Sequence, residues 1–309
     1  QGYSSAASDV YKRQMLEFNS ENFAQFGPAG NSDDFFEEGN KSVYDVPKWI
    51  EKNGLGAYEY QCGHGVRISD DSAKDLGSIA GDKHIRLSIH APYYISLSSV
   101  EEAKRDKSIE YILQTLRAAK NMGADRIVVH SGSCGKITRL EALKLASDTL
   151  CRAVKSADEN GYENIRICPE TMGKVNQLGN VEEVIKLCQI DERLLPTLDF
   201  GHINAQSLGK YNTKESIKSI FDLIENKLGY ERAKNFHAHY SRIEYTRAGE
   251  KKHHTMAETE YEPDFEPIAE LIAERNYTPR IICESAGTQT KDACAMQRIY
   301  KPVSYTHLT

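Results

Sequence analysis

The chain has 309 residues, of which 39% are hydrophobic and 27% are charged, and its formal net charge at pH 7 is −6. This length is sufficient for one large domain with a sizeable core or for two smaller domains. We find no apolar run of the roughly 20 residues needed to cross a bilayer and no secretory signal, so we expect a cytoplasmic protein. The seven cysteines form no C-x-x-C pair, which argues against a disulfide framework and a thiolate zinc site.

The two ends of the sequence differ in character from the rest. Residues 1–14 and 302–309 resemble translated sequencing-adapter read-through, so we expect non-native tails on either side of a single domain at 15–301. Met15 is the expected start of the native protein. No site residue is expected in either tail.

Eight short apolar runs are predicted to be strands, and in chain order they occupy residues 24–30, 56–62, 85–90, 126–132, 164–170, 195–200, 234–240 and 280–285. The segments between them have helical spacing. In the clearest of these, residues 100–123, one apolar stripe is formed by Ile109, Ile112, Leu113 and Leu116. Gly123 supplies its stop signal. Eight alternating strand and helix units without a linker predict an α/β fold, a single (β/α)8 TIM barrel.

Possible metal ligands end six consecutive predicted strands, the third to the eighth. In order they are His90, His130, Glu170, Asp199 with His202 just beyond, His237 with His239, and Glu284. A single histidine at a strand end is commonplace, but six strands in a row are not expected to end this way by chance. Because the carboxyl ends of barrel strands converge on one mouth, these side chains predict a metal site at that face. Imidazoles and carboxylates without thiolates suit zinc, manganese or iron.

Together, these strand ends resemble endonuclease IV, the zinc-dependent abasic-site endonuclease, and its relatives among the xylose isomerase-like barrels. The resemblance spans residues 24 to about 290 and rests on HAPYYISLSS (90–99), His130, PET (169–171), LDFGH (198–202), FHAHYS (236–241) and CES (283–285). It implies a DNA-repair hydrolase that cuts phosphodiesters at abasic sites. It also implies up to three zinc ions, with manganese as the alternative metal.

The resemblance further implies a ligand set for each ion. The first zinc would be held by His90, His130 and Glu170. The second would be held by Glu170 as a bridge, together with Asp199, His237 and Glu284. Glu170 and Glu284 are also the expected catalytic carboxylates, the former bridging two ions and the latter orienting the attacking water.

The third ion would take His202 and two residues from the loop after strand 7. The family has D-x-H in this loop, whereas this chain has GEKKHH (249–254) and offers no aspartate. Glu250 and His253 are the expected substitutes, since the longer glutamate side chain could offset one extra residue of loop. His254 is a competing candidate.

Three further residues are expected to contact the substrate. Tyr93 stands where the family has H-x-x-Y and would lie near the exposed backbone of an abasic nucleotide, or else be a simple rim aromatic. His239 replaces a family position that is polar but not a ligand, so we expect it to line the wall of the site. Arg242 begins a basic segment, 242–252, which either contacts phosphates or forms a solvated loop.

The charge of the chain and its ligand set leave alternatives open. A net charge of −6 is unlike that of many DNA binders, but three divalent ions would offset it and set the field at the mouth. The runner-up is a sugar isomerase or epimerase of the same barrel class, whose single metal would take Glu170, Asp199, His237 and Glu284. There the two glutamates would be the acid/base pair. A metal-binding barrel without catalysis is a third alternative.

His90 and His130 favour the nuclease, because a one-metal site has no need of them. The sequence implies no protein partner and no membrane contact, and we expect a monomer.

Overall fold

The computed structural model describes residues 22–306 of the chain. The predicted tail at 1–14 and the predicted start at Met15 lie outside the described residues, as do residues 307–309. The last helix, α12 (Gln289–Thr306), continues past the predicted boundary at residue 301. Across residues 22–306, no helix combines the length and the apolar character needed to cross a membrane.

Eight parallel strands form the barrel wall, and the predicted (β/α)8 fold is confirmed. They are β1 (Gln25–Pro28), β2 (Ala57–Gln61), β3 (Arg86–His90), β4 (Arg126–His130), β5 (Arg166–Glu170), β6 (Thr197–Asp199), β7 (His237–Tyr240) and β10 (Arg280–Cys283). Their order in the sheet is β1-β10-β7-β6-β5-β4-β3-β2. A parallel bridge between Ala29 and Glu59, with a 2.9 Å hydrogen bond from the Gly30 amide to the Glu59 carbonyl, brings the two outer strands together.

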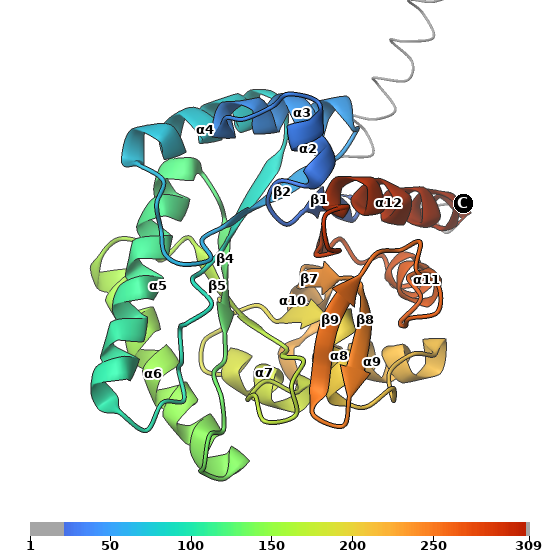
Figure 1. Ribbon diagram of the computed structural model, residues 1–309. Coiled ribbons are helices and arrows are strands. Elements are labelled where there is room, and N and C mark those ends of the chain that lie inside the picture. Colours follow the sequence, from blue (N-terminus) through green and yellow to red (C-terminus); the bar gives the residue numbers. More distant parts are fainter. Residues whose placement is uncertain (1–21, 307–309) are drawn as a thin grey trace, which may run out of the picture.

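Helices surround the strands, as Figure 1 shows. Besides α12 they are α2 (Asp33–Glu37), the 3-10 turn η1 (Val43–Asp45), α3 (Val46–Lys52), α4 (Asp70–Asp82), α5 (Glu102–Met122), α6 (Arg139–Glu159), α7 (Val181–Cys188), α8 (Phe200–Gln206), α9 (Lys214–Leu228), α10 (Tyr230–Lys234) and α11 (Glu266–Glu274). The predicted stripe on α5 faces the core: Ile109, Ile112 and Leu116 are buried and Leu113 packs at its edge. Gly123 ends α5 in the left-handed conformation, which costs glycine little.

A two-stranded antiparallel hairpin follows β7, where the sequence predicted only a loop. It consists of β8 (Arg242–Thr246) and β9 (Gly249–His254), drawn in orange in Figure 1. The ladder is irregular: Glu244 pairs with Lys252 and Tyr245 pairs with Glu250, so that Lys251 is an extra residue in a β-bulge. The bulge determines which β9 side chains share a face.

Candidate metal centre at the barrel mouth

A cavity of about 280 Å³ opens at the carboxyl ends of the strands. Its lining includes the predicted ligands His90, His130, Glu170, His202, Glu250, His253 and Glu284. They come from β3, β4, β5, α8, β9 and the end of β10, so barrel closure gathers residues that lie far apart in the sequence. Three adjoining groups of metal-ligating side chains can be distinguished.

The first group combines His90 and His130 with Glu170. Both imidazoles present Nε2 to the same carboxylate oxygen, Oε2 of Glu170, at 3.3 Å each. The two rings meet edge to face with centroids 5.0 Å apart. The other nitrogen of His90, Nδ1, lies 2.8 Å from the Ala91 carbonyl, which fixes the ring with Nε2 inward. The structure therefore brings together the three residues predicted for a first ion.

The second group consists of Glu170, Asp199, His239 and Glu284. His239 Nδ1 lies 3.0 Å from Oε1 of Glu170 and 3.4 Å from Oε1 of Glu284. Asp199 caps α8 through Oδ1, which accepts a 2.7 Å hydrogen bond from the His202 amide. Its other oxygen, Oδ2, is buried, accepts no hydrogen bond within residues 22–306 and has His202 Nδ1 as an ion-pair neighbour at 3.3 Å. A buried carboxylate oxygen that accepts no hydrogen bond fits a cation, because an unsatisfied buried acceptor is costly.

The third group combines His202 with Glu250 and His253. Glu250 lies between the two imidazoles: its Oε2 is 3.6 Å from His202 Nε2 and its Oε1 is 3.6 Å from His253 Nε2. Residues three apart point to opposite faces of a regular strand, but the bulge at Lys251 turns Glu250 and His253 to the same face. The predicted pair is therefore brought to His202, and by the bulge rather than by side-chain length.

A glycine at the third group permits this close approach. A Cβ built on Gly173 would lie 2.7 Å from Cβ of Glu250 and 2.8 Å from Cδ2 of His202. The Glu250 amide also donates a 2.9 Å hydrogen bond to the Gly173 carbonyl, which attaches β9 to the segment after β5. The sequence reasoning missed Gly173, because only the packed structure shows what its missing side chain makes room for.

The prediction that His237 belongs to the second group is corrected. His237 and His239 both point inward, but the ladder sets His237 level with Thr197 and His239 level with Asp199. His237 therefore lies one layer deeper, fully buried, with Nε2 2.8 Å from Oε2 of Glu59. His239, predicted to line the wall, is the β7 imidazole that meets Glu170 and Glu284. The error arose from taking the start of the strand for its end.

Two other predictions about the segment after β7 change. The Arg242 side chain is almost fully buried, and its guanidinium donates to the Met256 and Tyr261 carbonyls and to Asp264. It therefore braces the hairpin and does not face the cavity as a substrate contact. His254 is excluded from the third group, since it stacks on Tyr261 with centroids 3.7 Å apart and bonds to Glu258 at 2.9 Å.

The rim of the cavity carries Tyr93, which the sequence predicted either to contact the substrate or to be a simple rim aromatic. Its side chain is 47% exposed, and its hydroxyl lies 2.7 Å from Nδ1 of His64. Lys174 lines the same cavity from the segment after β5. The sequence reasoning did not single out Lys174, which stands in a polar stretch without a motif. A rim aromatic and a cation thus border the three ligand groups.

Buried carboxylates and imidazoles in contact shift one another's pKa values. Burial, with Glu284 and Glu170 close by, raises the pKa of Asp199 to about 6. Burial acts on Glu170 too, but His239 and the other imidazoles outweigh it and hold its pKa well below the usual range. Against the effect of burial, Glu284, Glu59 and Glu170 raise the pKa of His239 well above its usual value. The buried carboxylates are therefore stabilised by positive charge in the site. Divalent ions would supply that charge and leave the imidazoles neutral.

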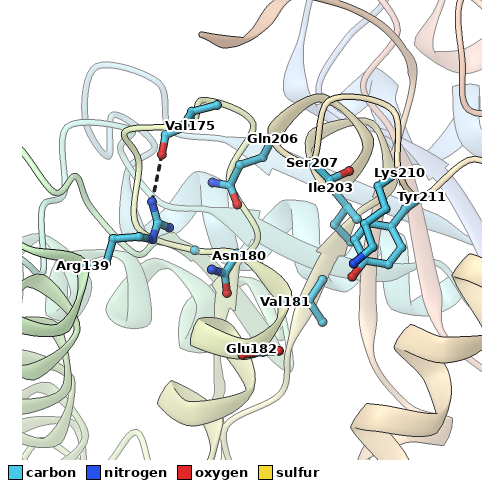
Figure 2. Close-up of a pocket in the computed structure, with 11 residues that line it drawn as sticks. Arg139, Val175, Asn180, Val181, Glu182, Ile203, Gln206, Ser207, Lys210 and Tyr211 are labelled. Carbon is cyan, nitrogen blue, oxygen red and sulfur yellow. Dashed lines mark hydrogen bonds between the residues drawn. The ribbon is translucent and has the colours of Figure 1, made fainter. Parts of the chain in front are cut away.

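A second cavity, of about 410 Å³, lies on the other side of the segment after β5. Figure 2 shows Arg139 on one side of it and Lys210 and Tyr211 on the other. Arg139 is already engaged, since its Nη1 donates a 2.8 Å hydrogen bond to the Val175 carbonyl. Among the residues that line this cavity, Glu182 carries the one carboxylate and none is a histidine. Its larger volume therefore does not make it the reaction site.

Comparison with known proteins agrees with this architecture. The family model of the xylose isomerase-like TIM barrels matches residues 47–300. The uncharacterized protein MJ0133 of Methanocaldococcus jannaschii is 32% identical over 251 residues, which cover 81% of this chain and 89% of the relative. The probable endonuclease 4 of Mycoplasma pneumoniae is 32% identical over 159 residues, and this match covers 50% of the chain but only 52% of the relative. The matches confirm the resemblance predicted from the strand-end motifs.

Solved structures share the fold without selecting a reaction. Endonuclease IV from Thermus thermophilus superimposes with a TM-score of 0.61 at 18% identity, covering 87% of this chain and 96% of that one. A D-tagatose 3-epimerase-like protein superimposes with a TM-score of 0.64 at 19% identity, covering 85% and 94%. The choice between these chemistries therefore has to come from the side chains at the mouth.

Proposed function

Because the chain belongs to the xylose isomerase-like TIM-barrel family, we propose that it is a metal-dependent phosphodiesterase that incises DNA at abasic sites. The observation that supports this most is that three adjoining groups of imidazoles and carboxylates share one mouth, the first of them through the contacts of His90 and His130 with Glu170. A one-metal reaction would need only the second group. The first and third groups, which add His90, His130, His202, Glu250 and His253, suit a multinuclear site.

The donor set fits zinc, with manganese as the alternative, because it consists of imidazoles and carboxylates only. When bound, such ions lower the pKa of a water and neutralise charge on the phosphate oxygens. Within the chain, Glu170 joins the first two groups through its two oxygens, Oε2 facing the first and Oε1 the second. Glu284 lines the cavity and is 17% exposed in its side chain, so it can hold the attacking water in place.

The rim residues have a role in holding the substrate. Tyr93 offers an exposed ring beside His90, where an extrahelical sugar or its neighbouring backbone could pack. Lys174 offers a cation for a phosphate, the contact that Arg242 cannot make. The endonuclease 4 relatives support DNA as the substrate, although their match to this chain spans about half of their length.

An incision assay tests the proposal. The zinc-loaded protein is expected to cut a duplex oligonucleotide 5′ to a synthetic abasic site, and His130→Asn is expected to lose one ion and most of the incision. His84→Asn is the matched control, since His84 is exposed at the opposite end of β3 and should change neither. If the wild-type protein binds its metals but leaves the oligonucleotide intact, the proposed substrate is wrong.

A one-metal sugar epimerase remains the second candidate, and one observation favours it. Glu170, Asp199, His239 and Glu284 alone form a complete Glu, Asp, His, Glu set on β5, β6, β7 and the end of β10. This reaction would exchange solvent hydrogen into a ketose at the carbon beside its carbonyl. Exchange of that kind with one ion per chain would replace the nuclease proposal.

A further inference from the structure

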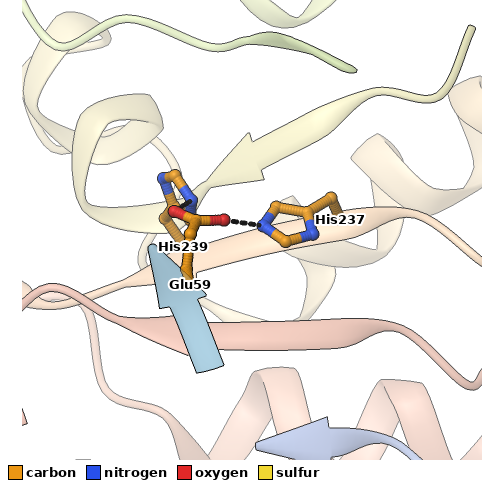
Figure 3. A group of neighbouring side chains, drawn as sticks. All are labelled: Glu59, His237 and His239. Atoms are coloured by element: carbon orange, nitrogen blue, oxygen red, sulfur yellow. Dashed lines mark hydrogen bonds and ion pairs between the residues drawn. The ribbon is translucent and has the colours of Figure 1, made fainter. Parts of the chain in front are cut away.

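A buried glutamate that the sequence reasoning missed lies directly behind the second ligand group. Glu59 is in the middle of β2, and Figure 3 shows its carboxylate between the imidazoles of His237 and His239. Oε1 lies 3.0 Å from His239 Nε2, and Oε2 lies 2.8 Å from His237 Nε2. Glu59 and both histidines are fully buried. A charged residue in the middle of a predicted barrel strand was the signal available in the sequence.

The carboxylate of Glu59 has enough donors to remain charged inside the barrel. Besides the two imidazoles, the Ser88 hydroxyl donates to Oε2 at 2.9 Å and the Gln61 amide donates to Oε1 at 3.1 Å. A buried carboxylate is tolerated when such bonds satisfy its oxygens. The imidazole donors His237 and His239 therefore carry hydrogen on the nitrogens that face Glu59.

This contact determines which nitrogen of His239 faces the metal centre. With Nε2 donating to Glu59, Nδ1 is left to face Glu170 and Glu284. His90 and His202 are held differently: each has Nδ1 against a main-chain carbonyl, of Ala91 and Thr171, and presents Nε2 inward. His202 Nδ1 also lies 3.3 Å from Oδ2 of Asp199, but that carboxylate belongs to the ligand groups themselves, whereas His239 is held from behind by a carboxylate outside all three groups. A carboxylate in this position raises the basicity of the imidazole as a metal ligand.

We infer that Glu59 is a positioning residue of the metal centre, one that fixes the ring of His239 and strengthens its Nδ1 as a ligand. His237 holds the second oxygen of Glu59 and so keeps the carboxylate in register with His239. The inference rests on the metal centre of the proposed function, but it holds equally for the nuclease and the epimerase. The competing possibility is that Glu59, His237 and His239 bind an ion of their own, although separations of 2.8 and 3.0 Å are those of hydrogen bonds.

Cobalt titration of the metal-free protein tests the inference without any substrate. Glu59→Gln keeps the shape but removes the charge and replaces one acceptor oxygen by an NH2 donor. Its affinity for the ion beside His239 is expected to fall about 10- to 100-fold, with a shifted cobalt absorption spectrum and an unchanged number of ions at saturation. Ser88→Ala is the control, because it perturbs the same buried carboxylate without touching His239, and it should leave the spectrum unchanged.

The possible outcomes are distinct. Wild-type affinity and spectrum in a folded Glu59→Gln protein would overturn the inference, and one ion fewer at saturation would make Glu59 a ligand instead. If Glu59→Gln does not fold, Glu59→Asp is measured in its place; it keeps the charge but withdraws the carboxylate by one methylene, and the same loss of affinity is expected. A wild-type protein that binds no cobalt would refute the metal centre itself. One that binds cobalt but cuts no DNA would refute only the nuclease.

Discussion

His237 and His239 lie two residues apart on β7 and point to the same side of the strand, yet only one of them reaches the second ligand group. Both contact the buried Glu59, and His239 also meets three acidic side chains of that group. The difference comes from height in the barrel, since only His239 stands level with Asp199. Spacing within a strand can predict which residues face inward. It cannot give their level against neighbouring strands, which depends on the register of the whole sheet.

Replacing each histidine separately by asparagine tests whether His239, and not His237, is the metal ligand. His239→Asn is expected to lose one ion per chain and at least about 100-fold in activity, because it removes a direct ligand. His237→Asn should keep every ion and lose stability instead, by about 1–3 kcal/mol, since it disturbs a buried hydrogen bond. Elemental analysis and thermal melting measure the two effects. The opposite pattern, an ion lost from His237→Asn alone, would restore the original prediction from the sequence.

The β8–β9 hairpin is the element that completes the third ligand group. Its bulge at Lys251 turns Glu250 and His253 to one face, and its attachment to Gly173 holds that face against His202. The sequence predicted Glu250 and His253, and the structure brings both near His202. The bulge that aligns them could not be predicted, because a bulge depends on pairing with the opposite strand. The bulge therefore absorbs the extra residue in GEKKHH, relative to the D-x-H of the resemblance, and Glu250 and His253 still share a face.

Changing the length of this strand tests the role of the bulge. Deleting Lys251 is expected to remove the bulge and leave glutamate and histidine two apart on a regular strand, still on one face, so that the third ion is retained. Inserting one alanine between Lys251 and Lys252 should enlarge the bulge by one residue, so that His253 no longer stands opposite Ile243 and the third ion is lost. Lys251→Ala is the control, since the Lys251 contact with Glu244 lies at the surface. Loss of the ion on deletion but not on insertion would contradict this explanation.

For the molecule as a whole, alternation of apolar runs and helical stripes was sufficient to predict the barrel, because each βα unit is a local pattern. Barrel closure then explains why residues at strand ends meet, which is why the predicted ligands other than His237 come together at the mouth. Glu59, Gly173 and the level of His239 escaped prediction, because each depends on contacts between strands or segments distant in the sequence. Local patterns specify elements, whereas these features belong to the assembled sheet.

Removal of the metal ions should lower the stability of the whole domain. The three groups hold several buried carboxylates close together, and ions that bind only the folded protein stabilise it. The expected stabilisation is about 2.7 kcal/mol per site when the free metal concentration is 100 times the dissociation constant. For a chain of this size, each such site corresponds to a rise of roughly 4 °C in Tm. Chelator-treated protein should therefore melt lower and recover when zinc is added, with a smaller recovery in His239→Asn. Equal melting temperatures with and without zinc would argue against a structural contribution from the ions.

The central claim, that the mouth holds a multinuclear centre, is tested most directly by anomalous X-ray scattering at the zinc edge from crystals of the zinc-loaded protein. We predict three peaks: one among His90, His130 and Glu170, one among Glu170, Asp199, His239 and Glu284, and one among His202, Glu250 and His253. A single peak confined to the second of these groups would contradict the claim and leave a one-metal enzyme.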